Sequence, residues 1–257
     1  MHRFIKIDGV HNFRDFGKYK TKTGEKVREK LLFRSGQLSN LTENGHAELS
    51  QLKIKTIVDL RKTNERKLQP NQIKGTIKQI TGSSKSDDGE TLPPHLQYLR
   101  DEEVTTQKTH DFMLQTYRRL PYEPMHVEIF NQAFAELTQP EHPILIHCAA
   151  GKDRTGILCA LILKTLDVHD DDIMDDYLLT NKVHNLDELV EKYAESISNR
   201  LGKKIDSKAM RPLGIVSEEY LQTAFDEIIN KNGSLLGYLN AIGIKENQLL
   251  QIRKNLI

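Results

Sequence analysis

Residues 143–166 read PILIHCAAGKDRTGILCALILKTL, which predicts a strand, a loop and a helix in direct succession. The run PILIH at 143–147 is short and apolar, as expected for a strand buried inside a sheet. The run TGILCALILKTL at 155–166 is a mostly apolar helix of the kind that packs into a core. Short strands that alternate with helices elsewhere in the chain predict an α/β protein.

The loop between this strand and this helix has the composition of an oxyanion-binding site. Such a loop can curl until the backbone N–H groups of residues 149–154 point inward, and the N-terminus of the next helix adds positive potential. Arg154, six positions after Cys148, can hold two phosphate oxygens through its planar guanidinium. We therefore expect phosphate or another oxyanion to bind here, on the backbone of residues that include Ala149, Ala150, Gly151, Lys152 and Asp153.

Cys148 lies where the same electric field favours a thiolate over a thiol. A thiolate inside a phosphate-binding loop predicts a phosphocysteine intermediate, in which Cys148 attacks phosphorus and Arg154 stabilises the equatorial oxygens. His147 is expected to orient the loop from behind, and Thr155 to donate a hydrogen bond to the sulfur. We expect no metal and no cofactor, because the arginine and the backbone amides supply the positive charge. Cys159 lies in the apolar helix and is predicted to pack in the core.

Other segments predict further elements around this unit. KTIVDLR at 55–61 indicates a second buried strand and GTIKQI at 75–80 another, and helices are expected at 41–52 and 127–137. A loop rich in Gly, Ser, Asp and Pro and a helical stretch near 109–120 form an apparent insertion over 81–125. The last third of the chain is predicted to be helical: Asp170 to Thr180, Asn185 to Arg200, Ser217 to Asn230, Ser234 to Ala241 and Lys245 to Asn255.

Composition and charge exclude several classes of protein. With 37% hydrophobic and 28% charged residues, the chain has the profile of a soluble globular domain. The sequence contains no apolar run long enough for a membrane span and no signal peptide, so we expect a cytoplasmic location, with export by a signal-free route left open. The net charge of +1 argues against nucleic-acid binding. Residues 1–80 nevertheless carry 18 basic against 8 acidic side chains, which favours either solvated faces or a basic rim for anionic substrates.

The loop HCAAGKDRTG resembles the signature of the cysteine-dependent protein tyrosine phosphatases, and in particular of the bacterial family that includes secreted mycobacterial and listerial tyrosine and lipid phosphatases. NFRDFG at 12–17, LLFRSGQLSNLT at 31–42, TIVDLRKTNER at 56–66 and EEYLQTAFDEIINKNGSLLGYLNAIGI at 218–244 follow the same pattern. The resemblance implies a phosphotyrosine phosphatase-like fold, with a central, mainly parallel sheet flanked by helices. We expect one domain over 1–257, with a variable lid-like insertion at 81–125 and a helical part at 167–257.

The resemblance implies that Cys148 is the nucleophile, that Arg154 binds phosphate and that Lys152 contacts additional negative charge, as on an inositol phosphate. It leaves the general acid open between Asp153 and a carboxylate of a mobile loop, for which Asp87 and Asp88 are the candidates. A second group of charged residues is predicted to form structural ion pairs that attach the N-terminal segment to the sheet, with direct substrate contact as the alternative: Arg14, Asp15, Arg34, Asp59 and Arg61.

The function predicted from these residues is metal-independent phosphomonoester hydrolysis. The expected substrate is a phosphotyrosine protein, and phosphoserine, phosphothreonine and phosphoinositides are further candidates. Two alternatives remain: an inositol polyphosphate phosphatase, favoured by Lys152 and the basic first 80 residues, and a phosphate-binding module without turnover. The sequence predicts no oligomeric state.

Overall fold

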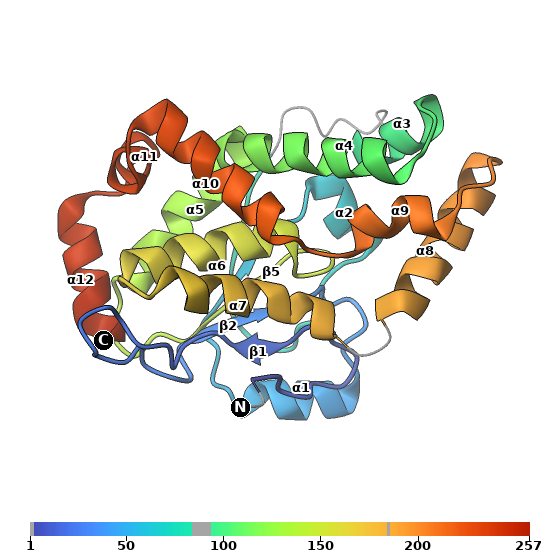
Figure 1. The fold of residues 1–257 in the computed structure, drawn as a ribbon. Coiled ribbons are helices and arrows are strands. Elements are labelled where there is room, and N and C mark those ends of the chain that lie inside the picture. The colour runs from blue at the N-terminus through green and yellow to red at the C-terminus, as the bar shows by residue number, and fades with distance from the viewer. Residues whose placement is uncertain (1–2, 84–93, 184–185) are drawn as a thin grey trace.

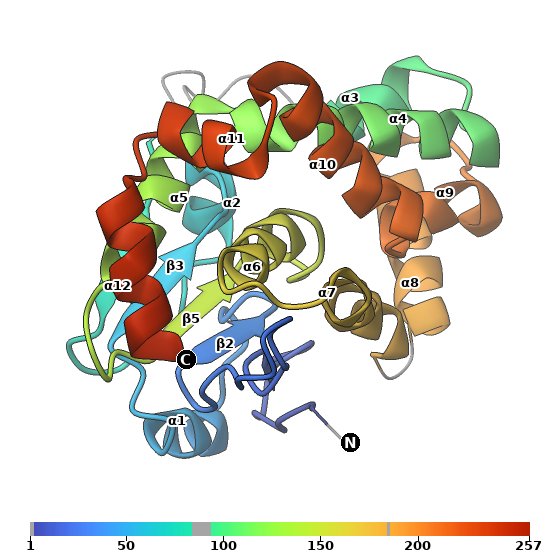
Figure 2. The same ribbon diagram turned by 60° about the vertical axis from the view of Figure 1, so that its left-hand side comes forward.

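The structure is a computed structural model that describes residues 3–83, 94–183 and 186–257. Its five described strands form one sheet in the order β1-β2-β5-β3-β4 (Figures 1 and 2). Four of them run parallel, and the short edge strand β1 is antiparallel to β2. The predicted, mainly parallel sheet is therefore confirmed. The strand bounds are β1 (Arg14–Asp15), β2 (Leu32–Ser35), β3 (Thr56–Asp59), β4 (Lys78–Thr81) and β5 (Ile144–His147).

The central strand β5 shows why the apolar run forms a buried strand. Its side chains alternate between two hydrophobic clusters, with Leu145 on one face of the sheet and Ile144 and Ile146 on the other. Strands β2 and β3 flank β5, and both Ser35 and Asp59 are in register with His147. The carboxyl ends of three parallel strands therefore meet at the loop that follows His147, which is where α/β folds place their ligands.

Helices cover both faces of this sheet. Helix α1 (Glu43–Ser50) lies on the face of Leu145, whereas α6 (Asp153–Thr165) belongs to the larger cluster on the opposite face, where α5, α10 and α12 surround it (Figure 2). The remaining helices are α2 (Thr63–Leu68), α3 (Pro94–Asp101), α4 (Thr106–Arg119), α5 (Pro124–Leu137), α7 (Asp170–Leu178), α8 (Leu186–Leu201), α9 (Ser207–Gly214), α10 (Glu218–Asn232), α11 (Leu235–Ala241) and α12 (Glu246–Leu256).

Two distant segments of the chain pack together beside the sheet. Helix α3, from the predicted insertion, shares a hydrophobic cluster with α8 and α9 of the helical C-terminal third (Figure 1). Its buried members are Leu96, Leu99, Ala194, Ile197, Ile205 and Met210. Helix α3 is thus joined to a second helical segment that the sequence did not connect with it. Among the described helices, none is both long and apolar enough to cross a membrane.

Candidate active site

The loop after β5 is shaped by Gly151. This residue has φ of +68°, and a Cβ atom there would lie 2.2 Å from the backbone oxygen of Ser35. Only glycine fits that position without a shift of the backbone. The Gly151 carbonyl oxygen accepts hydrogen bonds from Asn12 Nδ2 at 2.9 Å and from Arg34 Nη2 at 3.0 Å. Two side chains from the N-terminal part of the chain therefore fix the direction of this peptide.

The two preceding carbonyl groups of the loop point in the same outward direction. The Ala149 oxygen accepts a hydrogen bond from the backbone N–H of Gln37 at 2.9 Å, and the Ala150 oxygen accepts one from Asn12 Nδ2 at 3.3 Å. The N–H and C=O groups of a trans peptide point in opposite directions. Because the carbonyl groups face outward, the N–H groups of residues 150–152 face the interior of the loop, as an anion-binding loop requires.

A buried ion-pair cluster supports this arrangement from behind. Asp176 of α7 accepts from Arg34 Nη1 at 2.7 Å and pairs with Arg14 Nε at 3.3 Å, and the three side chains are almost completely buried. Burial alone would raise the pKa of Asp176, but the two guanidinium charges hold that pKa below its usual value. Arg14 and Arg34 thus form structural ion pairs, but their partner is Asp176 of α7, which the sequence analysis did not include in this group, and Arg34 also binds the loop. Asp15 instead accepts from the backbone N–H groups of Gly17 at 2.8 Å and Lys30 at 2.7 Å.

Cys148 and His147 lie at the carboxyl end of β5. The Cys148 side chain is nearly buried, and His147 is completely so. His147 Nδ1 lies 3.3 Å from the Cys148 carbonyl oxygen, and Nε2 lies 3.5 Å from Asp59 Oδ2. Burial lowers the pKa of His147 even though Asp59 opposes that shift, so the imidazole is neutral at pH 7. The sequence-based expectation that His147 supports the loop agrees with this geometry.

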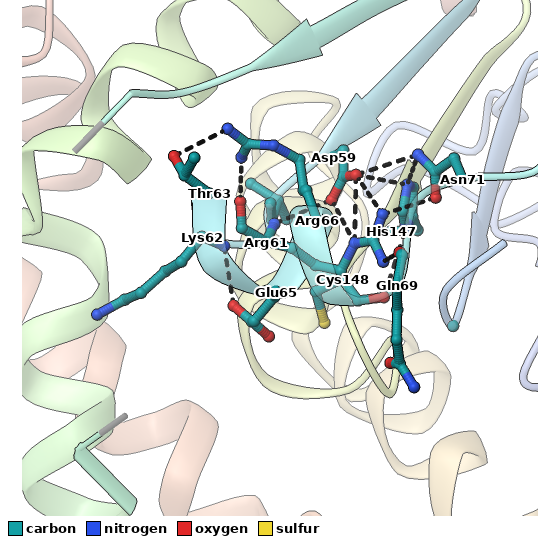
Figure 3. Close-up of polar contacts among 12 residues, drawn as sticks. Asp59, Arg61, Lys62, Thr63, Glu65, Arg66, Gln69, Asn71, His147 and Cys148 are labelled. Atoms are coloured by element: carbon teal, nitrogen blue, oxygen red, sulfur yellow. Dashed lines mark hydrogen bonds and ion pairs between the residues drawn. The ribbon is translucent and has the colours of Figure 1, made fainter. Parts of the chain in front are cut away.

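Asp59 and Arg61 form a second buried pair beside the loop. Arg61 Nε lies 2.9 Å from Asp59 Oδ1 and Nη2 lies 2.7 Å from Oδ2, and Asn71 Nδ2 also reaches Asp59 Oδ2 at 3.1 Å (Figure 3). The carboxylate of Asp59 is satisfied by these donors and by the backbone N–H of Arg61 at 3.0 Å. It has the contacts of a structural residue that orients the end of β5, rather than those of a substrate ligand.

Arg154 is held by a residue that the sequence analysis did not identify. Glu65 of α2 accepts from Arg154 Nη1 at 2.7 Å and from Nη2 at 2.9 Å. Nη1 also donates to the Leu60 carbonyl oxygen at 3.1 Å. Burial alone would raise the pKa of Glu65, but the charge and hydrogen bonds of Arg154 outweigh burial and lower that pKa to about 2. The pair is therefore ionised throughout the physiological range.

These contacts determine which edge of the Arg154 guanidinium remains for a ligand. A guanidinium has five N–H donors. Glu65 and the Leu60 carbonyl together use both hydrogens of Nη1 and one hydrogen of Nη2. The two other donors, on Nε and Nη2, lie along one edge and can bind two oxygens of a phosphate side by side. Glu65 thus positions the arginine for the role that the signature implies.

Asp153 begins α6 and is held from two sides. Its Oδ1 atom accepts from Tyr117 OH at 2.6 Å and from Lys152 Nζ at 2.9 Å. Lys152 Nζ also donates to the Ile215 carbonyl oxygen at 3.2 Å. The ammonium of Lys152 is therefore engaged with Asp153 and with the segment before α10, and its side chain is 8% exposed. The contact of Lys152 with additional negative charge on a substrate stays a prediction.

Two further expectations about the site have different outcomes. The Thr155 hydroxyl is buried and makes no hydrogen bond, so the expected bond to the Cys148 sulfur is wrong for this structure. The helix begins at Asp153, which places Thr155 in its first turn with its side chain enclosed by the core. Asp87 and Asp88, the alternative general acids, lie outside the described residues.

His95 of α3 is a further residue near the site. Burial, together with the positive charges of Arg154 and Lys152, lowers the pKa of His95 to about 4, although the Glu65 carboxylate opposes this shift. The imidazole is therefore neutral at pH 7. Neither His95 nor Glu65 follows from the signature. The one sequence signal for Glu65 is its place three residues after Lys62, where its side chain accepts from the Lys62 backbone N–H at 2.8 Å and caps α2.

A nearly buried cysteine, an inward-facing peptide loop and an arginine with a free edge, all at the carboxyl end of a parallel sheet, define a cysteine-dependent phosphatase. Comparison with known proteins agrees. The chain belongs to the tyrosine phosphatase family, whose model matches residues 5–257. It is therefore an enzyme of the protein tyrosine phosphatase class.

Two curated relatives are similar along most of their length. The chain is 28% identical to the triple specificity protein phosphatase PtpB of Mycobacterium tuberculosis, covering 96% of each protein. It is 27% identical to a putative tyrosine-protein phosphatase of Cupriavidus necator, covering 91% of this chain and 82% of that protein. Among solved structures, the core catalytic domain of the PP-IP phosphatase SIW14 from S. cerevisiae matches with a TM-score of 0.31 and 18% identity, over 83% of this chain and 94% of that domain.

Proposed function

We propose that this chain hydrolyses phosphomonoesters through a phosphocysteine intermediate, with Cys148 as nucleophile and Arg154 as the phosphate-binding arginine. The observation that carries the proposal is the loop itself: its carbonyl groups at 149–151 are held outward, and the Nε–Nη2 edge of Arg154 remains for an anion. Both features stabilise negative charge on three equatorial oxygens, which is where charge resides during phosphoryl transfer. The N–H groups of the loop and the guanidinium of Arg154 supply the positive potential for this stabilisation.

In the first step the Cys148 thiolate attacks phosphorus and the phosphorus–oxygen bond to the leaving group breaks. Asp153 donates a proton to the departing oxygen, so that an alcohol or phenol leaves. In the second step Asp153 accepts a proton from water, whose oxygen attacks phosphorus, and the sulfur–phosphorus bond breaks. Inorganic phosphate leaves, and the Cys148 thiolate and protonated Asp153 are regenerated. Asp153 is favoured for both roles because it follows the loop directly and its side chain is 23% exposed.

The proposed substrate is a phosphotyrosine protein, with phosphoserine, phosphothreonine and phosphoinositides as further substrates. Membership of the tyrosine phosphatase family supports the first, and the name of the mycobacterial relative, a triple specificity phosphatase, supports a broader range. The phenolate of tyrosine is the better leaving group, so it needs less help from the general acid than an alkoxide does. Inositol polyphosphates are the second candidate, favoured by the 18 basic side chains of residues 1–80.

We also propose that α3, within segment 81–125, covers the entrance to the site together with α8 and α9. The shared hydrophobic cluster of these helices and the effect of Arg154 on His95 support this arrangement. A Leu99→Ala variant, which removes a fully buried side chain from that cluster, is expected to loosen the cover and to raise the rate with bulky phosphoprotein substrates. Unchanged rates for bulky and small substrates would refute this part.

The test is phosphate release by the wild-type enzyme and Cys148→Ser, with a chelator present throughout. The substrates are a phosphotyrosine peptide, a phosphothreonine peptide, a phosphoinositide and inositol hexakisphosphate. Cys159→Ser is the matched control, because that thiol is also buried but lies in the middle of α6. We expect turnover by the wild type and the control and none by Cys148→Ser. Phosphate binding without release by the wild type would indicate a binding module instead.

A further inference from the structure

Two buried tyrosines connect Asp153 of α6 to two other helices, α4 and α7. Tyr117 of α4 places its hydroxyl oxygen 2.6 Å from Asp153 Oδ1 and 2.6 Å from the hydroxyl oxygen of Tyr177 on α7. Both tyrosines are almost completely buried, and their rings meet edge to face at 81°. Three helices, α4, α6 and α7, therefore meet at one short chain of hydroxyl groups that ends on the carboxyl group of Asp153.

The chemistry of the groups fixes the direction of these hydrogen bonds. An ionised carboxylate only accepts, so Tyr117 donates its proton to Asp153. A phenol has one proton, so the hydroxyl of Tyr117 accepts from Tyr177 in turn. Burial, and the neighbouring Asp153 carboxylate, raise the pKa values of both tyrosines well above 10, so neither phenol loses its proton at physiological pH. The pair is a permanent donor toward Asp153.

The same carboxyl oxygen receives a second donor. Lys152 Nζ reaches Asp153 Oδ1 at 2.9 Å, and Lys152 is itself held by the Ile215 carbonyl oxygen at 3.2 Å. A carboxylate oxygen has two lone pairs, and both on Oδ1 are now used. A proton on Asp153 must therefore be carried by Oδ2. Two independent elements thus determine both the orientation of the carboxyl group and the oxygen that exchanges protons.

We propose that Tyr117 and Tyr177 are positioning residues for proton transfer, and that they hold Asp153 so that Oδ2 is the atom that gives and takes the proton. The inference rests on the proposed role of Asp153 as general acid and base. In phosphocysteine formation, the Oδ2 proton moves to the leaving oxygen as the phosphorus–oxygen bond breaks. In hydrolysis of the intermediate, Oδ2 accepts a proton from the attacking water. The tyrosine protons stay on their own oxygens throughout.

The effect of this positioning depends on the leaving group. An alkoxide leaving group needs a proton in the transition state, whereas an activated aryl oxide leaves without one. Loss of the Tyr117 hydroxyl should therefore slow the hydrolysis of poor leaving groups and leave activated aryl phosphates nearly unaffected. Loss of a purely structural contact would slow both kinds of substrate alike. The ratio of the two rates separates the two explanations.

The test compares Tyr117→Phe with the wild type, using a phosphothreonine peptide and an aryl phosphate with electron-withdrawing substituents. We expect kcat for the peptide to fall about tenfold at unchanged KM, a fraction of what a positioned acid contributes, and kcat for the aryl phosphate to change less than about threefold. In an Asp153→Asn background, the added Tyr117→Phe change should have no further effect on the peptide rate. Tyr177→Phe should also lower kcat for the peptide, by a smaller factor than Tyr117→Phe.

Tyr238→Phe is the matched control. Its hydroxyl is also buried and donates one hydrogen bond, to the Pro121 carbonyl oxygen at 2.7 Å, but it joins α11 to the turn after α4. This variant loses a bond of the same kind and should keep the wild-type ratio of the two rates. If Tyr117→Phe is too unstable to purify, Tyr177→Phe carries the same comparison.

Equal losses on both substrates, or a full tenfold loss in the Asp153→Asn background, would overturn the inference. A different result would overturn the proposed function instead: turnover that survives in Cys148→Ser. If Cys148→Ser is inactive but Asp153→Asn keeps the wild-type peptide rate, the nucleophile stands, Asp153 is not the general acid, and the positioning role of the tyrosines is refuted.

Discussion

Replacement of Glu65 by glutamine tests how Arg154 is held. The variant keeps the size of the side chain but removes the charge that pairs with Arg154 through two hydrogen bonds of 2.7 and 2.9 Å. Arg154 is then left largely buried, with 17% of its side chain exposed and no ionised partner on its Nη1–Nη2 edge. A charge in that position is costly because water does not solvate it fully.

The size of the effect follows from the pKa of Glu65. Folding lowers this pKa from 4.5 to about 2. At about 1.36 kcal/mol per pKa unit, the ionised carboxylate contributes about 3 kcal/mol to the free energy of unfolding. Since 28% of the Glu65 side chain is exposed, solvent screens part of this electrostatic contribution. We therefore expect Glu65→Gln to lower the free energy of unfolding by about 2 to 3 kcal/mol at pH 7.

The sign of the pH dependence follows from the same shift. A carboxyl group with a lowered pKa in the folded state stabilises the protein fully above its unfolded pKa of 4.5. The contribution disappears as the pH falls toward the folded pKa of about 2. Urea unfolding of wild type and Glu65→Gln should therefore give a constant difference between pH 7 and about pH 5.5 and a shrinking difference below pH 4.5.

Glu43→Gln is the control for this experiment. Glu43 pairs with Lys74, but both side chains are mostly exposed. Such exposed pairs contribute little, so the control should unfold at nearly the same urea concentration as the wild type. If Glu65→Gln were as stable as the control at pH 7, or if its difference from the wild type did not change down to pH 3.5, the ion pair would not hold Arg154 as described.

Three further outcomes follow from the site. Gly151→Ala should lower the free energy of unfolding by about 2 kcal/mol or more and abolish the binding of inorganic phosphate in calorimetry. The reason is that the alanine Cβ would lie 2.2 Å from the Ser35 backbone oxygen, at a φ of +68°. Phosphate binding with wild-type affinity would contradict the loop geometry. Asp176→Asn should lower the free energy of unfolding in urea by about 3 to 5 kcal/mol, since two buried arginines lose their shared carboxylate, and a loss below about 1 kcal/mol would count against the buried cluster. Burial raises the pKa of Cys159 to about 12, so iodoacetamide at pH 8 should add no more than one group to the native chain by mass spectrometry, and none to Cys148→Ser; two adducts would contradict this.

The strand, loop and helix of 143–166 could be predicted because neighbouring residues in the sequence determine all three. An apolar run, small residues and an arginine at fixed spacing are properties of neighbouring positions. Strands β1 and β2 lack such a local signal. They carry Arg14 and Arg34, which are buried only because Asp176, more than 140 residues away, neutralises them. The sequence could place both arginines in structural ion pairs, but it could not identify a partner so far along the chain.

Three helices near the site were not predicted. Helix α3 (Pro94–Asp101) begins inside the segment whose Gly, Ser, Asp and Pro content predicts a loop. The other two were missed for different physical reasons. Helix α2 (Thr63–Leu68) has no buried residue, so it shows no apolar periodicity, and Glu65 went unnoticed with it. Helix α9 (Ser207–Gly214) contains Pro212, which normally interrupts a helix. It forms because Met210 packs into the cluster shared with α3. Both helices depend on tertiary contacts rather than on propensity.

The contacts that support Asp153 were equally beyond a sequence pattern. Its donors are Lys152, which is adjacent, and Tyr117, which lies 36 positions earlier on another helix. The pattern could place Asp153 in the loop but could not show which of its oxygens is occupied. It also left Asp87 and Asp88 as alternatives, because loop carboxylates carry no periodic signal.

The donors that hold the catalytic loop come from far along the chain, with 139 positions between Asn12 and Gly151 and 162 between Arg14 and Asp176. During synthesis on a ribosome, the N-terminal segment emerges first and can pair with β2, but Asn12 and Arg14 lack their partners in the loop and in α7 until both have followed. A nascent chain that ends before residue 176 therefore carries Cys148 without a fixed loop around it. The loop should therefore take its anion-binding shape only after residue 176 has been made.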